Sequence, residues 1–256
     1  MEQKLTRRSA LKGLGFGAAA VASAGALFST PFLIDDVEAA TRTNAAGITD
    51  VDILNFALNL EYLEAEFYAY TTGGNGIPVE LTNGVGKEGL TTGGSATDFN
   101  SDSVLQAVAL NIADDELDHV KYLRRALGRR AIGKPAIKLD PLGSTASAAA
   151  FLTYSRAFED TGVSAYGGAA KLITSKEVLG AAARILATEA YHAGSIRLQV
   201  VQKGLSVSAL DGKDVPPTLT TFFAVYSKAL AIVRNVKEVL KIVEPFFPNG
   251  LNGKIR

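Results

Sequence analysis

Two short stretches indicate how this chain folds: Glu116-Leu-Asp-His119 and Glu189-Ala-Tyr-His192. Each has a glutamate three residues before a histidine, and the chain of 256 residues holds no other histidine. Both lie in segments whose apolar residues recur at spacings of three and four, which predicts helices. Residues three apart share a helix face, so each pair directs a carboxylate and an imidazole to one side. Two such helices supply half of a two-metal site in a four-helix bundle, and the other half is one glutamate from each of two further helices.

The composition is typical of a helical globular protein with a sizeable core. Apolar residues make up 47% of the chain, and 26 basic residues balance 26 acidic ones. This balance gives no indication of a nucleic-acid partner or of an acidic tail. The chain has no cysteine, which excludes thiolate metal sites and disulfides. Any metal must therefore be held by oxygen and imidazole ligands.

The first 39 residues are predicted to be an export signal that is removed. Arg7 and Arg8 lie in a stretch that resembles the twin-arginine signature, and a weakly apolar run over residues 13–28 follows it. Small residues at 37–39 predict cleavage after Ala39. The alternative is an uncleaved anchor, but the run is short and alanine-rich for a bilayer span. We expect a periplasmic or extracellular protein without stable membrane insertion after cleavage.

The first helix of the predicted bundle covers residues 48–70, with Asp50 as its cap. Its apolar stripe contains two carboxylates, Glu61 and Glu64. A buried charge is costly unless it is paired or bound to a metal, so either glutamate is a candidate ligand. Glu66 lies off the stripe and is expected in solvent.

The remaining helices are predicted from the same periodicity. The second covers residues 102–127, the third 145–174 and the fourth 176–203. Glu159 is the one acid on the stripe of the third helix. A narrow apolar seam predicts a fifth helix over residues 218–243, packed on the bundle or on a second subunit.

Two connections complete the predicted architecture. Residues 71–101 form a long polar loop, which we expect to be a lid or a subunit contact. Residues 128–144 are long enough to run the length of a bundle. The sequence therefore predicts an all-α four-helix bundle over residues 48–204, with a long crossover between its second and third helices. Residues 205–256 add a loop and the extra helix.

Together these helices carry four carboxylates and two imidazoles on their apolar faces. The simpler alternative is that each histidine is satisfied by the glutamate of its own helix. An apolar core with up to four unpaired carboxylates is implausible without cations, which favours a metal site. Such mixed ligands suit iron, manganese or zinc. The predicted ligands are Glu61, Glu116, His119, Glu159, Glu189 and His192, with Glu64 as the substitute for Glu61.

The order Glu, ExxH, Glu, ExxH resembles the ferritin-like di-metal carboxylate superfamily over roughly residues 48–204. Asn59-Leu-Glu-Tyr-Leu-Glu-Ala-Glu-Phe-Tyr68, Phe158-Glu-Asp160 and Glu189-Ala-Tyr-His192 look like the desiccation-related ferritin-like proteins. The resemblance implies two iron ions, with manganese as the alternative. It also favours Glu61 over Glu64, because bacterioferritin-type first helices place a tyrosine seven residues after the ligand glutamate, as Tyr68 is placed here.

Three functions remain open at this point. The first is an exported di-iron oxidoreductase that oxidises Fe(II) or consumes peroxide or O₂ in stress protection. In it Glu116 and Glu189 bridge the metals, and Tyr68 or Tyr191 donates an electron or a hydrogen bond. The second is a manganese catalase-like enzyme. The third is a non-enzymatic, desiccation-protective protein whose metals only fix the bundle. The expected partners are the metal ions, with O₂ or peroxide, and a homodimer is left open.

Overall fold

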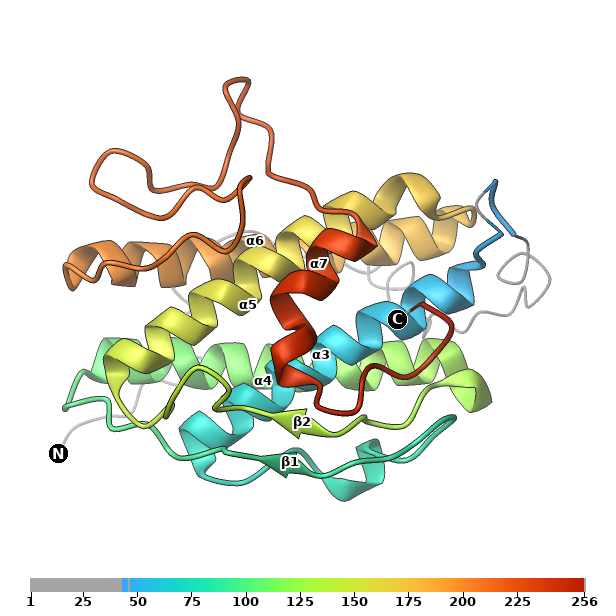
Figure 1. Cartoon of the computed structure of the whole chain (residues 1–256), viewed down its shortest axis with the longest axis horizontal. Coiled ribbons are helices and arrows are strands. Elements are labelled where there is room, and N and C mark those ends of the chain that lie inside the picture. The colour runs from blue at the N-terminus through green and yellow to red at the C-terminus, as the bar shows by residue number, and fades with distance from the viewer. Residues whose placement is uncertain (1–42, 46, 256) are drawn as a thin grey trace, which may run out of the picture. The chain divides into compact units, whose positions relative to one another are not determined.

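The computed structural model describes residues 43–45 and 47–255, so the predicted export signal lies outside the described residues. Four long helices form an all-α bundle, as predicted (Figure 1). Helix α3 packs against α4, and α5 packs against α6. Within the described part of the chain, no helix is both long and apolar enough to cross a membrane. The helices are α3 (Asp50–Gly73), α4 (Ser103–Leu127), α5 (Ala148–Ala169) and α6 (Lys176–Gln202).

The helix starts are fixed by side-chain caps. Thr49 caps α3, since its hydroxyl accepts from the backbone of Asp52 at 3.1 Å and the Asp52 carboxylate accepts from the backbone of Thr49 at 2.9 Å. The prediction that Asp50 caps this helix is wrong. Asp50 is buried and accepts from the backbone N–H groups of Thr174 at 2.9 Å and Ser175 at 2.7 Å. It therefore joins the start of α6 to the start of α3.

Helix α3 is buried on nearly all sides because a second layer covers its outer face. This layer contains β1 (Thr91–Thr92), which pairs in parallel with β2 (Ile137–Lys138) of the crossover. The expectation that Glu66 is solvated is wrong, because its side chain lies under this layer, 3.4 Å from the Lys134 ammonium. Residues 74–102 thus cover α3.

Short 3-10 turns extend or join the helices. They are η2 (Val79–Leu81), η3 (Gly128–Arg130) after α4, and η4 (Ala170–Leu172) after α5. The third helix is accordingly shorter than predicted, and η4 leads directly to the α6 cap. A further short helix, α7 (Val236–Val243), ends in η5 (Glu244–Phe246) and packs on α5.

The predicted fifth helix is wrong over residues 218–235, which are not helical. Their backbone makes isolated bridges at Thr218↔Thr221 and Val225↔Ala231. In a helix, the carbonyl of Phe222 would accept a hydrogen bond from the backbone of the next turn. Here it accepts one from the buried side chain of Arg197 at 2.5 Å. The tertiary contacts of this segment therefore outweigh its helical periodicity.

Residues 205–235 are held on the bundle by a buried network of arginines and aspartates. Asp160 of α5 accepts from Arg197 at 2.7 Å and lies 2.8 Å from Nε of Arg156. Arg156 also donates to Asp214 at 2.5 Å, and Arg234 binds Asp211 through two hydrogen bonds of 2.8 and 2.9 Å. Buried charges need such pairing to offset their desolvation. The network fixes the segment against α5 and α6.

Candidate metal centre

The structure brings the six predicted ligands together in the middle of the bundle. They fall into two groups, and within each group one nitrogen or oxygen atom per residue lies within 4.8 Å of the others. Every member is buried. Two glutamates belong to both groups, so each can contact two adjacent ions. The groups are Glu61, Glu116, His119 and Glu189, and Glu116, Glu159, Glu189 and His192.

The imidazoles face the carboxylates of the other helices as well as their own. Nδ1 of His119 lies 3.1 Å from Oε2 of Glu61 and 3.3 Å from Oε1 of Glu189. Nδ1 of His192 lies 2.9 Å from Oε1 of Glu116 and 3.3 Å from Oε2 of Glu159. The i, i+3 spacing on α4 and α6 thus converges on one centre across the bundle.

Both acids of the α3 stripe are inside the bundle. Glu61 belongs to the first ligand group, and Glu64 is buried beside the cluster but belongs to neither group. Gly162 of α5 leaves the space that these carboxylates need. A Cβ at this position would lie 2.3 Å from Oε2 of Glu189 and 3.3 Å from Oε1 of Glu64.

Burial and mutual repulsion give the carboxylates different protonation states. Burial, and then repulsion from Glu116, raises the pKa of Glu189 well above its ordinary value. The pKa of Glu64 is also raised well above its ordinary value, by burial and by repulsion from Glu189. For Glu116, burial acts in the same direction, but hydrogen bonds from His119 and His192 outweigh it and lower its pKa. In the metal-free protein we therefore expect Glu116 to ionise at lower pH than Glu64 and Glu189, which hold their protons to higher pH.

The histidines are shifted in the opposite sense. Burial alone would lower the pKa of His192, but hydrogen bonds and attraction from Glu116 and Glu159 raise it to about 12. The pKa of His119 rises for the same reason, with Glu61 as the strongest attraction. A bound cation replaces the imidazolium protons as the partner of the carboxylates.

The donor atoms that are left without partners fit metal ions. Within the described residues, Glu116 Oε1, Glu159 Oε2 and both carboxylate oxygens of Glu189 are buried without a well-directed hydrogen bond. Buried polar atoms in native proteins are nearly always satisfied, and a cation bound here would satisfy these oxygens. Carboxylate and imidazole donors at two adjacent positions suit iron and manganese.

Comparison with known proteins agrees with this geometry. A family model of the ferritin-like domain matches residues 49–202, more than half of the chain. The chain belongs to the ferritin-like domain family. A stretch of 90 residues is 32% identical to the ferritin-like catalase Nec2 of Nesocodon mauritianus, and it covers 34% of this chain and 27% of that relative. The chain thus spans about a quarter of the relative that it matches.

Two tyrosines connect the halves of this ferritin-like bundle crosswise. Tyr68 follows Glu61 by seven residues on α3, and its hydroxyl donates to Glu159 of α5 at 2.5 Å. Tyr166 follows Glu159 by seven residues, and its hydroxyl donates to Glu61 at 2.5 Å. From the sequence, no role was predicted for Tyr166. The repeated spacing of seven was the signal that could have identified it.

Tyr191 has no comparable position. Its side chain is 73% exposed, and it lines a 350 Å³ surface depression together with His192 and Asp115. Asp115 orients an imidazole from outside the centre: its Oδ2 lies 3.1 Å from Nε2 of His192.

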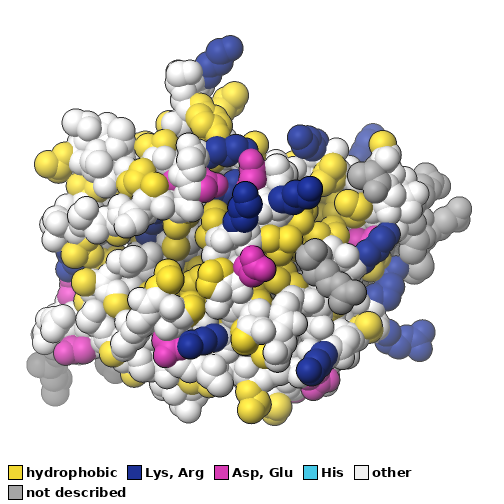
Figure 2. Space-filling view, in the orientation of Figure 1, with side chains coloured by type: hydrophobic (Ala, Val, Ile, Leu, Met, Phe, Trp, Pro, Cys, Tyr) yellow, Lys and Arg dark blue, Asp and Glu magenta, His cyan; other side chains and the backbone are white. Residues whose placement is uncertain are grey.

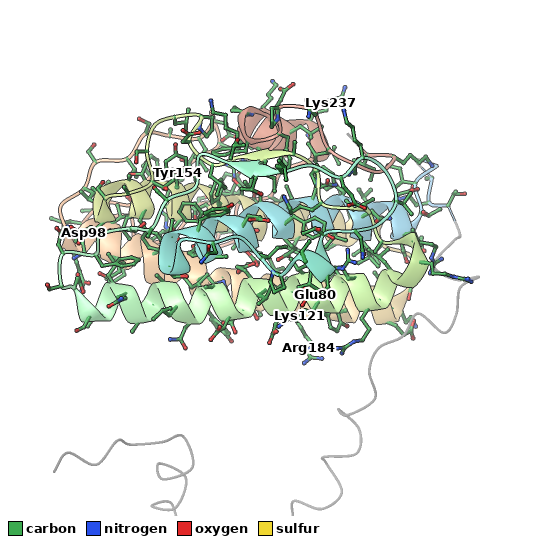
Figure 3. All side chains as sticks on the ribbon, turned by 90° about the horizontal axis from the view of Figure 1, so that it is seen from below. Glu80, Asp98, Lys121, Tyr154, Arg184 and Lys237 are labelled. Atoms are coloured by element: carbon green, nitrogen blue, oxygen red, sulfur yellow. The ribbon has the colours of Figure 1, made fainter. Side chains whose placement is uncertain are left out.

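His119 has a separate opening of 280 Å³ between α4 and α6. This opening is lined by Arg184 and Thr188 among others, and Figure 3 shows Arg184 beside Lys121 on that face. Thr188 is the residue before Glu189 on α6, which is the position that Asp115 occupies before Glu116 on α4. The two histidines are therefore reached from the same side of the bundle, but among the described residues only His192 has a carboxylate within hydrogen-bonding distance of its outer nitrogen.

Proposed function

We propose that this ferritin-like protein holds two iron or manganese ions and acts as an oxidoreductase on peroxide or O₂. The observation that carries the proposal is the pair of buried ligand groups that share Glu116 and Glu189. Shared carboxylates place two ions next to each other, as two-metal redox chemistry requires. Bound iron or manganese supplies the electron-transfer chemistry that the side chains lack.

The side chains have separate tasks in this proposal. Glu116 and Glu189, which belong to both ligand groups, would hold both ions, and Glu61 and Glu159 would each hold one of them. The Tyr166 and Tyr68 hydroxyls hold these two terminal carboxylates in orientation through hydrogen bonds. The openings between α4 and α6 give polar reactants a short path to the histidines.

Asp115 serves as the proton-handling group at the outer edge of the centre. Its carboxylate is half exposed and contacts Nε2 of His192 at 3.1 Å, so it connects the buried imidazole to solvent. A reactant that consumes or releases protons at the centre can exchange them along this path. His119 lacks an equivalent carboxylate, so the path lies on the His192 side.

Two reactions are consistent with the centre, and the protein compared above favours peroxide. The 32% identity to a protein described as a ferritin-like catalase supports disproportionation of hydrogen peroxide, for which manganese is the metal to test first. If the centre holds iron, the corresponding reaction is oxidation of Fe(II) by O₂ or peroxide. Purified protein loaded with each metal should evolve O₂ from peroxide or oxidise Fe(II) faster than the free metal does. If it does neither, the enzymatic proposal fails.

The non-enzymatic alternative has a distinct outcome. A protein whose metals only fix the bundle would bind two ions, show a large drop in melting temperature on chelation, and have no turnover.

We further propose export by the twin-arginine route with a role in stress protection, supported by Arg7 and Arg8. Replacing both arginines by lysine should retain the protein in the cytoplasm, and unchanged export would contradict this. Sedimentation of the purified protein tests the homodimer.

The order of importance of the ligands is a direct test of the bridging scheme. Glu116→Ala and Glu189→Ala should each abolish binding of both ions, because each removes a contact to both. Glu61→Ala should retain at least one ion, and His119→Ala should be intermediate. Metal analysis after titration with Fe(II) or Mn(II) decides this. If Glu61→Ala loses both ions, the assignment of bridges is wrong, and if all variants bind normally, there is no site.

A further inference from the structure

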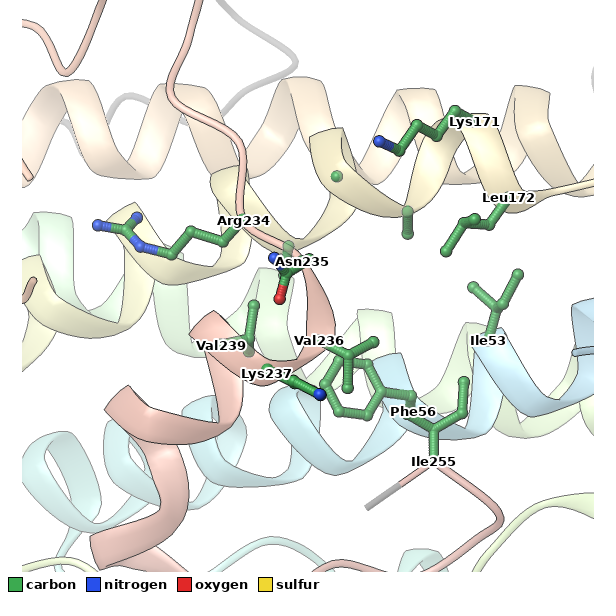
Figure 4. Close-up of a pocket in the computed structure, with 13 residues that line it drawn as sticks. Ile53, Phe56, Lys171, Leu172, Arg234, Asn235, Val236, Lys237, Val239 and Ile255 are labelled. Atoms are coloured by element: carbon green, nitrogen blue, oxygen red, sulfur yellow. The ribbon is translucent and has the colours of Figure 1, made fainter. Parts of the chain in front are cut away.

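A second cavity lies on the opposite side of the bundle from the two histidine openings. It has a volume of about 370 Å³ and lies between α3, the end of α5, α7 and Ile255 near the C-terminus (Figure 4). Figure 3 shows Lys237 of α7 on one side of the molecule and Lys121 and Arg184 on the other. The cavity is therefore separate from the openings that lead to the metal centre.

The cavity is built by close contact between α5 and the segment before α7. A Cβ at Gly168 would lie 1.9 Å from the carbonyl oxygen of Arg234, so only glycine permits this approach. The backbone N–H of Arg234 donates to the carbonyl of Ser164 at 3.0 Å, and its side chain donates to the Ser164 hydroxyl at 3.0 Å. The guanidinium also binds Asp211. The wall is thus fixed in the folded protein, and Arg234 is already fully paired.

The lining is mostly apolar and includes three cationic side chains, of which Arg234 is already paired with Asp211. Most of the wall is aliphatic or aromatic, and Figure 2 shows hydrophobic side chains gathered on this face with Lys and Arg side chains around them. Lys171 and Lys237 line the cavity, and no acidic residue does. Within the residues that the structure describes, no ion pair to either lysine occurs. The apolar lining residues are Ile53, Phe56, Ala165, Ala169, Leu172, Val236, Val239 and Ile255.

We propose that this cavity binds an amphiphile with one anionic head and a short apolar tail, of the class of a medium-chain fatty carboxylate. Pockets that hold small molecules measure about 300–1,000 Å³ and are mostly apolar with a few placed polar groups, and this cavity lies at the lower end of that range. The tail would contact Phe56 and Val239, and the head would lie at the rim, beside the ammonium group of Lys171 or of Lys237 (Figure 4). Long lysine side chains suit this role, since they contact apolar surface with their stems and keep the charge at the rim.

The proposal does not depend on the metal centre. The deep wall, which includes Phe56 and Ala165, also borders a separate 30 Å³ cavity that Tyr166 lines, and none of the residues that line the larger cavity is a predicted metal ligand. Binding should therefore occur with metal-loaded and with chelator-treated protein alike. Loss of the proposed enzymatic function would leave this site unaffected.

Isothermal titration calorimetry on the full chain tests the site with decanoate, decanol and decyltrimethylammonium, each below its micelle threshold. Decanoate should bind saturably with one site per chain. Decanol should bind about tenfold more weakly, and the cationic amphiphile more weakly still. Equal binding of all three would refute the charge selectivity. Absence of decanoate binding would refute the site itself.

Matched variants locate the site. Each lysine is exposed, so each is expected to contribute only about threefold. The double variant Lys171→Gln/Lys237→Gln should therefore weaken decanoate about tenfold and leave decanol within twofold. Lys241→Gln, on the same helix α7 but outside the lining, should change neither. Ala169→Phe should fill the cavity and abolish binding of both ligands. If the lysine variants bind decanoate normally, the proposal is wrong, even where the filling variant fails to fold.

Discussion

The two shared glutamates should differ sharply in what they do for the metal-free protein, although both are expected to bridge the metals. Glu116 is the ionised partner of both imidazoles, and its pKa is lowered by their hydrogen bonds despite its burial. Glu189 is buried with a pKa raised well above its ordinary value, so we expect it to be the more readily protonated of the two. Glutamine is a close neutral mimic of a protonated glutamate but a poor substitute for an ionised one.

The magnitudes follow from these protonation states. Glu116→Gln leaves two buried imidazolium groups without their shared counter-charge, and breaking a buried ion pair costs about 3–5 kcal/mol. The amide still accepts a hydrogen bond, so we expect a loss of about 3 kcal/mol. In a domain of this size that lowers the melting temperature by about 6–12 °C. Glu189→Gln replaces one neutral group by another, so its effect should stay within about 1 kcal/mol.

Thermal melts of chelator-treated protein, followed by circular dichroism, measure the difference, and metal titration then measures the shared role. Both variants should lose both ions. Glu80→Gln, an exposed position on η2, serves as the control and should match the wild type in both assays. If metal-free Glu189→Gln melts lower than metal-free Glu116→Gln, the protonation assignment is reversed. If either variant still binds two ions, that glutamate is not a bridge.

Three further changes have expected outcomes. Because the pKa values of Glu64 and Glu189 are raised in the fold, the native metal-free protein binds more protons than the unfolded chain above their ordinary pKa of 4.5, and its melting temperature should fall as the pH rises above that value; a flat or rising profile in a pH series of melts would contradict this. Gly162→Ala places a Cβ 2.3 Å from Oε2 of Glu189, so metal occupancy measured by elemental analysis should fall about tenfold or more, and full occupancy would show that the carboxylate has room to move. Asp211→Asn removes the charge that pairs with the buried Arg234 guanidinium, and because Asp211 is partly exposed the cost in urea unfolding should be about 2 kcal/mol; an unchanged midpoint would mean that the network does not hold the C-terminal segment.

Local patterns sufficed to predict the four-helix bundle and the set of residues at its centre. The i, i+3 spacing of Glu116 and His119, repeated at Glu189 and His192, is a property of a helix and does not depend on what packs around it. Acids such as Glu159 on an apolar stripe are informative for the same reason, since burial of an unpaired carboxylate is costly in any fold. Whether these residues bind metal stays a prediction.

The errors arose where a segment is covered by something distant in the sequence. Glu66 was expected in solvent because an apolar stripe predicts one buried face per helix. In the structure, the β1–β2 layer covers the other face of α3 as well. Residues 218–235 carry a helical period, but Arg197 binds the carbonyl of Phe222 and Asp211 binds the side chain of Arg234, which holds the segment in a non-helical path. The roles of Tyr166 and Asp115 likewise depend on which helices face each other.

The sequence by itself thus determined which side chains share a face, because helical geometry converts spacing directly into direction. Only the tertiary structure decided which faces meet, which glutamate of α3 enters the ligand groups, and which acids keep their protons. Those outcomes depend on distances between helices and on desolvation, and both are set by long-range packing. A carboxylate such as Glu189 takes its protonation state from neighbours on other helices, and a single helix pattern contains no information about them.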